Sequence, residues 1–456
     1  MSIRDTAPPP GPPRPYHFPN VVRRTLANGL KILVAENHSA PLVAIRALVC
    51  SGADRDTPEL AGLASLTAEL LDEGAGARDA IQLAEALGFL GATLGTGTDW
   101  DASYVTIDVL SKNLEAALEV FADVVRRPML PEPALERVRS ERLMELLQQR
   151  EEPGAIAGRR FSNLLYGTGT YGNTVMGNAE SIDRVTIDDV RQSYARNFIP
   201  NNTALVLAGD IDASKTIAVV ERLFGDWKRG PAPQATVITP APIDGSRIYL
   251  IDRPNAVQSE IRIGHIGVPR SSEDYFPLTV MNALLGGVFN SRINLNLRER
   301  HGYTYGARSL FAFRRQAGPF VVSAPVRNEV TLASVTEMFN ELRRIRTGDI
   351  ETQELGDTKA YLAGVFPATV QSSSDIAGRI LDMELYDLPH DYFDRYRENI
   401  IAVSAKDVAR VAEKYIDPDR ALVVIVGNAS QIREPLNTLG LPIQHLDVDG
   451  NTLPLA

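Results

Sequence analysis

Two stretches of this chain share one pattern: IDDVRQSYARNFIPNNTALVLAGDID at residues 187–212 and AKDVARVAEKYIDPDRALVVIVGNAS at residues 405–430. Each predicts an amphipathic helix, a proline-containing turn and an apolar strand. Asp189 and Asp407, and likewise Pro200 and Pro418, hold matching places in the two stretches. This match indicates that one structural module occurs twice in the chain.

A second pair of stretches, nearer the start of each half, supports the duplication. VAIRALVCSGADRDTPELAGLASL begins at Val43 and SEIRIGHIGVPRSSEDYFPLTVMNALL begins at Ser259. Both predict a buried strand, a polar turn and an apolar helix, in the same order relative to the first pair. The expected fold class is therefore α+β, with two homologous α/β sandwich modules in which helices cover one face of an antiparallel-rich sheet.

Changes in composition set the expected boundaries. The sequence predicts the following parts: a flexible leader containing PPPGPPRP at 1–20, a first module at 21–229, a linker rich in proline and small residues at 230–246, a second module at 247–445 and a tail at 446–456.

Within the first module, Asn28-Gly29 is a strong hairpin signal between two apolar runs. The remaining expected elements are strands at 42–50, 103–110 and 203–210 and helices at 58–73, 78–88, 113–126, 133–150 and 187–197.

Charge and cysteine content exclude several classes of partner. The 456-residue chain has 47 Lys+Arg against 57 Asp+Glu, a net charge of -10, which argues against nucleic acids and anionic membranes. Its single cysteine, Cys50, excludes an internal disulfide framework and a cysteine-based zinc site. No apolar run is long enough to predict a membrane span.

The proline-rich start resembles that of a mature exported protein, so we expect a periplasmic location, with the cytoplasm as the alternative.

The stretch LLGGVFNSRINLNLRERHGYTYGAR, residues 284–308, predicts a helix that turns sharply into a strand. We expect Gly286-Gly287 to end one helix, and a second helix to run to Arg300 and end at Gly302 in the left-handed conformation. In that helix we expect apolar Phe289, Ile293, Leu295 and Leu297 on one face, and Arg292, Asn296, Glu299 and Arg300 mainly on the other. The alternation of Tyr303 and Tyr305 predicts a strand, which brings Arg298 close to Tyr305. Taken alone, the pair is also explained as a helix-end cation and an ordinary strand residue.

With the duplication, these motifs resemble the pitrilysin and insulinase (M16) class of zinc peptidases, which includes mitochondrial processing peptidase and its bacterial relatives. The resemblance spans about residues 21–444. Members of the class carry HxxEH, in which two histidines and a distal glutamate bind zinc and the inner glutamate is the general base. Here the matching stretch is GLASLTAELLDEG, with Ser65, Ala68 and Glu69 at the motif positions and Glu145 at the distal ligand position.

These substitutions imply that the chain binds no catalytic zinc and does not hydrolyse peptides alone. Ser65 and Ala68 provide neither an imidazole ligand nor a carboxylate base. None of the six histidines lies between Ser65 and Glu145, so no shift of register restores the motif. Glu69 and Glu145 remain open to two interpretations: a weak oxygen site for a hard cation, or polar residues on two packed helices.

The second half retains the other motif of the class. NLRERHGYTYG places Arg298 and Tyr305 at the spacing at which members carry an arginine and a tyrosine that bind substrate and stabilise the tetrahedral intermediate. In two-subunit members this pair acts on the zinc site of the partner. The resemblance therefore implies a non-catalytic subunit of a heterodimeric zinc endopeptidase, with peptide substrates, zinc in an HxxEH-bearing partner and no cofactor of its own. The alternative is a structural or peptide-binding protein of this class with no role in proteolysis.

Overall fold

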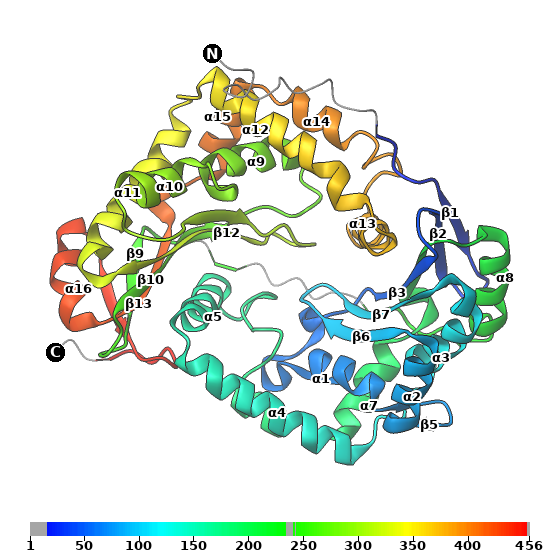
Figure 1. Ribbon diagram of the computed structural model, residues 1–456. Coiled ribbons are helices and arrows are strands. Elements are labelled where there is room, and N and C mark those ends of the chain that lie inside the picture. The colour runs from blue at the N-terminus through cyan, green and yellow to red at the C-terminus, as the bar shows by residue number, and fades with distance from the viewer. Residues whose placement is uncertain (1–15, 234–239, 242, 454–456) are drawn as a thin grey trace, which may run out of the picture.

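The computed structural model describes residues 16–233, 240–241 and 243–453. Most of the predicted leader, residues 1–15, lies outside the described residues, as do residues 234–239 and 242 of the predicted linker and 454–456 of the tail. The described chain forms two modules, each built on a six-stranded sheet (Figure 1).

The first sheet is mixed. Its strands, in spatial order, are β1 (Val21–Thr25), β2 (Lys31–Glu36), β8 (Thr203–Gly209), β3 (Leu42–Val49), β7 (Ser103–Leu110) and β6 (Thr93–Thr98). β2 and β8 are parallel, and every other neighbouring pair is antiparallel. The predicted hairpin is present between β1 and β2, where Gly29 has a φ of 89°.

The second sheet repeats this plan. Its strands, in spatial order, are β11 (Arg308–Phe311), β12 (Pro319–Arg327), β10 (Gln258–Ile266), β13 (Leu422–Gly427), β9 (Arg247–Asp252) and β14 (Ile443–Leu446). The order β2-β8-β3-β7-β6 in the first sheet corresponds to β9-β13-β10-β12-β11 in the second, including the one parallel pair in each run. The predicted fold class of two homologous α/β modules is confirmed.

Helices cover both sheets. Those of the first half are α1 (Leu63–Glu69), α2 (Ala80–Leu90), α3 (Leu114–Arg126), α4 (Glu132–Glu151), α5 (Pro153–Tyr166), α6 (Ala179–Arg184), α7 (Ile187–Asn197) and α8 (Ala213–Phe224). Those of the second half are α9 (Tyr275–Asn282), α10 (Arg292–Asn294), α11 (Thr331–Arg346), α12 (Thr352–Val365), α13 (Ser373–Leu385), α14 (Tyr396–Ala402), α15 (Ala405–Tyr415) and α16 (Ala429–Leu436).

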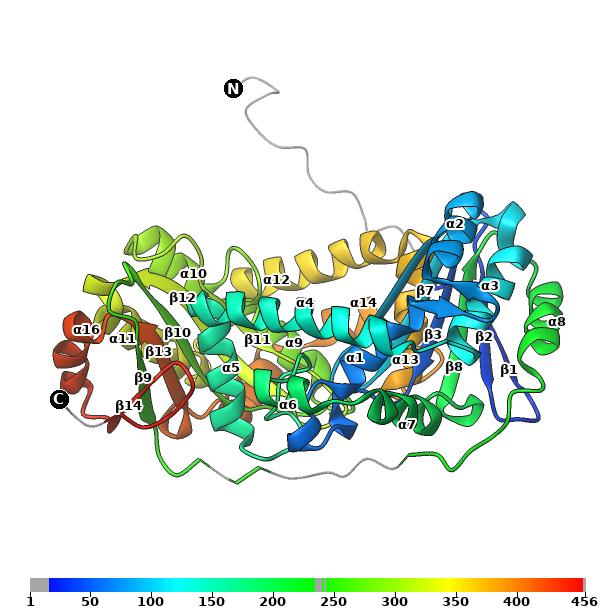
Figure 2. The ribbon, with the colours of Figure 1, turned by 90° about the horizontal axis from the view of Figure 1, so that it is seen from below.

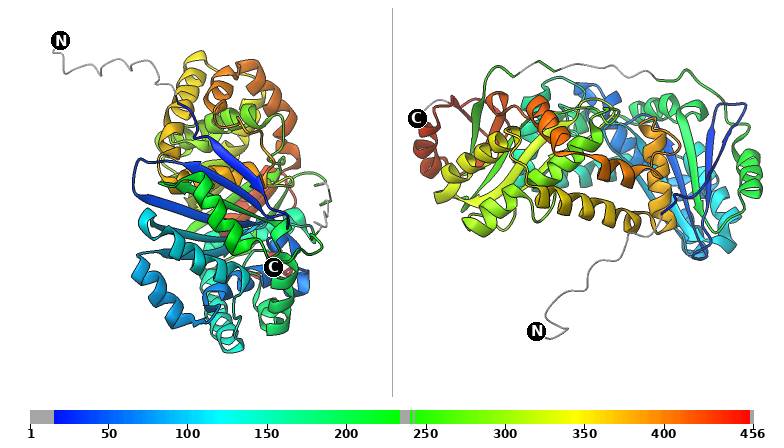
Figure 3. Two further views of the ribbon diagram at one scale, coloured as in Figure 1. Left: turned by 90° about the vertical axis from the view of Figure 1, so that its right-hand side faces the viewer. Right: turned by 90° about the horizontal axis from the view of Figure 1, so that it is seen from above.

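The two modules exchange one helix each. α13 comes from the second half of the chain but packs on β3 and β8 of the first sheet. α5 comes from the first half but packs on β13 and β10 of the second sheet. The two sheets consequently lie at opposite ends of the molecule with the exchanged helices between them (Figures 2 and 3).

Apolar side chains fix α13 in this position. Ile376, Ile380 and Met383 form one buried cluster with a face of the first sheet that includes Leu33 and Val206. Ile380 is completely buried, so the helix replaces water over strands that would otherwise expose an apolar surface.

A buried arginine adds polar contacts at the edge of this interface. Arg46 of β3 donates from Nη2 to Ser374 Oγ of α13 at 2.6 Å and to Asp108 Oδ1 of β7 at 2.8 Å. These charge-assisted bonds satisfy an arginine that is only 6% exposed.

The same arrangement holds α5 on the second sheet. Ile156, Phe161 and Leu165 lie in one buried cluster with Val424 and Val426 of β13. The prediction that helices cover one face of each sheet was therefore incomplete, because neither α5 nor α13 was predicted and each covers the opposite face of the other half's sheet. β8 is buried at every residue for this reason.

The predicted helix at 58–73 is interrupted. Gly62 has a φ of 95°, and a Cβ at this position would lie 2.6 Å from Ile182 Cδ1. α1 therefore begins only at Leu63, after a separate short turn of helix, Pro58–Leu60. Among the described residues, no helix has the length and apolar composition required to cross a membrane.

Removal of buried apolar volume at the exchange should destabilise the protein. Because Ile380 is fully buried, we expect Ile380→Ala to lower the free energy of unfolding by about 2 to 5 kcal/mol. The matched control is Ile81→Ala on α2, where the isoleucine is 72% exposed and the same change should cost little. Urea unfolding followed by circular dichroism measures both. Equal stability of the two variants would show that α13 does not contribute to the core of the first module.

Candidate functional site

The degenerate HxxEH positions lie on α1, which packs against α4 and α7. Ala68 is completely buried and Ser65 is 6% exposed. The hydroxyl of Ser65 donates to the carbonyl of Gly62 at 3.4 Å, one turn earlier in the same segment. This face of α1 is therefore part of the packed interior.

The guanidinium of Arg142 on α4 lies among the three predicted ligand positions. Its Nη1 donates to Ser65 Oγ at 2.7 Å, its Nη2 donates to Glu69 Oε1, and its Nε lies 3.6 Å from Glu145 Oε2. Nη1 also donates to the carbonyl of Met176 at 3.2 Å, and the Arg142 side chain is only 5% exposed. The positively charged guanidinium of Arg142 thus contacts all three residues.

The electrostatics of this cluster differ from those of a zinc site. Burial raises the pKa of Glu69, while Arg142 acts to lower it and Glu145 acts to raise it. A zinc ion prefers imidazole or thiolate ligands, whereas these positions offer a serine hydroxyl, two carboxylates and a guanidinium that would repel a dication. Within the described residues, no group of three or more His, Cys, Asp or Glu side chains is placed to hold a metal. The donor set at this site does not fit zinc.

The sequence alone did not identify Arg142 as part of the site. Arg142 and Glu145 are three residues apart on α4, a spacing that puts both on one helix face. That spacing is the signal in the sequence that could have linked Arg142 to the site. The pairing with Ser65 and Glu69 depends on how α4 packs against α1, which no local pattern encodes.

In the second module, α9 continues as a π-helical segment, Ala283–Gly287, and the next residue, Val288, is extended. Gly286-Gly287 therefore ends the first helix, as predicted. The following helix consists of α10 and a π-helical segment, Leu295–Arg300. Ile293 and Leu297 are fully buried, as expected for an apolar face.

Glu299 and Arg300 are exposed, as predicted, but the remainder of the amphipathic pattern was wrong. Phe289 and Leu295 are 62% and 42% exposed, while Arg292 and Asn296 are buried. The buried face is polar because the other helices supply counter-charges. Arg292 forms a bidentate pair with Glu354 of α12, at 2.7 Å from Nε and 2.6 Å from Nη2.

Asn296 has a similar partner on α11. Its amide donates to Glu341 Oε1 at 2.7 Å and to Glu337 Oε2 at 2.9 Å. Paired groups of this kind are tolerated in an interior because their desolvation is compensated.

Gly302 takes the predicted left-handed conformation, with a φ of 63°, and its N–H donates to the carbonyl of Arg298 at 3.1 Å. The prediction of a strand at Tyr303 and Tyr305 was wrong, because β11 starts only at Arg308. Thr304 Oγ1 accepts a bond from Gly306 N at 3.1 Å, and this local turn competes with strand pairing.

Arg298 and Tyr305 remain on the surface of this corner. The Arg298 guanidinium lies 4.5 Å from the centroid of the Phe289 ring, and its Nε lies 3.4 Å from Glu299 Oε1. Tyr305 is 93% exposed. Within the part of the chain that the structure describes, no hydrogen bond or ring contact joins Arg298 to Tyr305. The sequence also gave no indication that Phe289 packs on Arg298.

The Arg142 cluster should control how stability depends on pH. Arg142→Met keeps much of the buried stem but removes the charge, so we expect a loss of about 1 to 3 kcal/mol in the free energy of unfolding. The loss of Arg142 also removes an interaction that lowers the pKa of Glu69, so the folded-state pKa rises further. The folded state then holds the Glu69 proton more tightly than the unfolded state. Stability should consequently fall more steeply than in the parent as pH rises above the ordinary carboxyl pKa of 4.5.

Urea unfolding at several pH values between about 4 and 8 measures this difference. Arg137→Met is the matched control on the same helix, since that side chain is 50% exposed and pairs with Glu73 and Glu141 at the surface. We expect it to cost less than about 1 kcal/mol. Parallel pH curves for Arg142→Met and the parent would contradict the assigned cluster.

Comparison with known proteins gives the family. The model described as Insulinase (Peptidase family M16) matches residues 31–179, and the model described as Peptidase M16 inactive domain matches residues 184–362. An uncharacterized zinc protease of Streptomyces coelicolor is 24% identical over 412 residues, covering 89% of this chain and 89% of its own length. A non-peptidase homolog, YmxG of Helicobacter pylori, is 23% identical and covers 87% of this chain and 91% of its own length.

A solved structure shares the architecture. The peptidase M16 inactive domain from Pseudomonas fluorescens has a TM-score of 0.85 and 28% sequence identity, and the match covers 90% of this chain and 98% of that one. The two matched models follow one another along the chain, as the two modules do. The chain belongs to peptidase family M16.

Proposed function

We propose that this chain is a non-catalytic subunit of a heterodimeric zinc endopeptidase and that it supplies Arg298 and Tyr305 to the zinc site of an HxxEH-bearing partner. The main support for this proposal is the contrast between the degenerate HxxEH region and the region of Arg298 and Tyr305. One holds a buried guanidinium among the predicted ligand positions, and the other presents an accessible arginine and tyrosine.

The chemistry of the pair supports this role. A guanidinium donates charge-assisted hydrogen bonds to a carbonyl or an oxyanion, and a tyrosine hydroxyl donates without a formal charge. Tyr305 has nearly all of its surface free to approach a second molecule. Arg298 is held by the Phe289 ring rather than by a bidentate carboxylate, which leaves donors available.

The pair also lies far from the chain's own degenerate site. α1 belongs to the first module, and α10, which leads into Arg298, belongs to the second, on the opposite side of the molecule (Figure 1). Action in trans is therefore the arrangement that we propose. In this proposal zinc belongs to the partner, peptides are the substrates, and the compartment is the periplasm.

Assembly is the first test. Co-expression with an HxxEH-bearing relative from the same genome should give a heterodimer in size-exclusion chromatography at micromolar concentration. Elemental analysis should find zinc in the heterodimer and none held tightly by the isolated chain. Separate elution of the two chains, or about one zinc per isolated chain at the α1–α4 corner, would contradict the proposal.

Substitution of the pair tests its role directly. Tyr305→Phe removes one exposed hydroxyl, so assembly should be unchanged while peptide turnover by the heterodimer falls about 10²- to 10³-fold. Tyr361→Phe on α12 is the matched control, because Tyr361 is also exposed, at 56%, and should be neutral. Arg298→Ala should also raise KM, because it removes a charged donor. If both variants assemble and cleave at the parent rate, the pair is structural and the chain is a member of the family with no role in proteolysis.

A further inference from the structure

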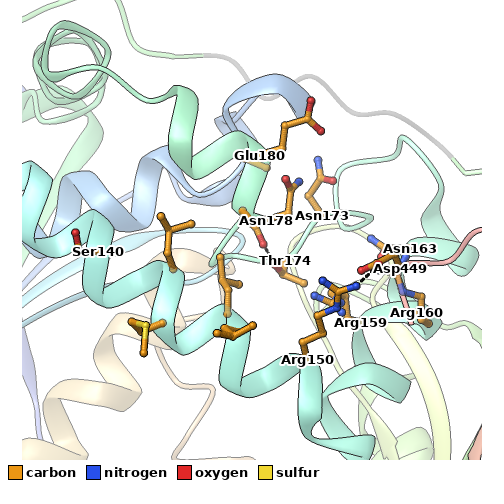
Figure 4. A pocket seen from close by; sticks show the side chains of 17 residues that line it. Ser140, Arg150, Arg159, Arg160, Asn163, Asn173, Thr174, Asn178, Glu180 and Asp449 are labelled. Carbon is orange, nitrogen blue, oxygen red and sulfur yellow. Dashed lines mark hydrogen bonds and ion pairs between the residues drawn. The ribbon is translucent and has the colours of Figure 1, made fainter. Parts of the chain in front are cut away.

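A cavity of about 830 Å³ lies between α4, α5 and the segment before α6 (Figure 4). Neither Arg298 nor Tyr305 lines it. Its volume falls in the range of pockets that bind small ligands, about 300 to 1,000 Å³. Two ends of different chemistry can be distinguished in it.

One end is cationic. Arg150 of α4 and Arg159 and Arg160 of α5 gather there around the carboxylate of Asp449, from the turn after β14 (Figure 4). Arg150 pairs with Asp449 through Nη2, and Arg159 Nη2 donates to the carbonyl of Val448 at 3.5 Å. Asp447 also acts on Arg160, so three guanidinium groups face two carboxylates, which leaves local positive charge on a chain whose net charge is -10.

Two of these arginines have unused donors. The Nε atoms of Arg159 and Arg160 are buried and have no hydrogen-bond partner within the described residues. Burial is the main cause that lowers the pKa of both guanidinium groups. Since arginine remains charged in proteins, the local environment penalises that charge, and a bound anion would relieve the penalty.

The other end is apolar. Leu143, Met144 and Leu147 line it from α4, where Met144 is 67% and Leu147 56% exposed. The side-chain amide of Asn173 also lines the cavity, and among the described residues it has no hydrogen-bond partner. An amide in this position can pair with a peptide main chain.

We propose that this cavity binds the free C-terminal carboxylate of a peptide whose last residues are apolar. The arginines bind the carboxylate, the apolar side chains of the peptide pack against α4, and Asn173 forms a hydrogen bond with a main-chain group. The entire pocket lies within this chain, so the inference does not depend on a catalytic partner or on the role of Arg298 and Tyr305.

Binding to the isolated chain is the test. The probe is an N-acetylated, dye-labelled tetrapeptide ending in two leucines with a free carboxylate, measured by fluorescence polarisation. The same peptide with a C-terminal amide should bind at least about 10-fold more weakly, because the charge-assisted bonds are lost. Equal binding of acid and amide would overturn the proposal without any change to the protein.

Single substitutions test whether the peptide binds in this cavity. Arg159→Gln and Arg160→Gln should each weaken binding of the acid about 10- to 100-fold, whereas Arg191→Gln on α7, a 52% exposed arginine outside the cavity, should have no effect. Asp449→Asn should strengthen binding because it removes the competing carboxylate, and a general loss of folding cannot produce this opposite change. Unchanged affinity in the two glutamine variants, with thermal unfolding like that of the parent, would overturn the proposal.

A fatty acid has a carboxylate and an apolar chain but no peptide main chain to pair with Asn173. Decanoate should therefore compete only weakly with the tetrapeptide. If decanoate binds and the tetrapeptide acid does not, the pocket belongs to a lipid-derived anion and the peptide proposal is wrong.

Discussion

The structure depends on the exchange of α5 and α13 between the two modules. Each sheet has two apolar faces, and the helices that follow its own strands along the chain cover only one. The second face is covered by a helix from the other half, so that apolar surface leaves water only when both halves have folded. Neither half of the chain can therefore bury all of its apolar surface alone.

This constraint explains why the duplicated modules stay alike in the sheets while they differ at their corners. The strands that contact the exchanged helix must stay apolar, as in β8 and β13, where every residue is buried. The polar residues around α1 and α10 carry no such requirement, because neighbouring side chains pair with them. Arg142 serves this purpose in the first module, and Glu354 and Glu341 serve it in the second.

The arginines discussed above fall into two sets: those that pair with carboxylates inside the protein and those with donors that have no such partner. Arg142 and Arg292 are both buried and engaged with carboxylates, so their charges serve the packing of helices. Arg298 lies at the surface on an aromatic ring, and the Nε atoms of Arg159 and Arg160 are buried without an acceptor among the described residues. The proposed functions rest on this second group.

Local sequence patterns were enough to predict the duplication, the α+β class, the hairpin at Asn28-Gly29, the left-handed turn at Gly302 and the loss of the HxxEH ligands at Ser65, Ala68 and Glu69. These features arise from local patterns or from residue identity, which the chain carries without its partners in space. The tertiary structure alone decided the exchange of α5 and α13, the place of Arg142 among Ser65, Glu69 and Glu145, the burial of Arg292 and the irregular path through Tyr305. Each of these depends on which distant segment supplies an apolar face or a counter-charge, and periodicity within one segment holds no information about that neighbour.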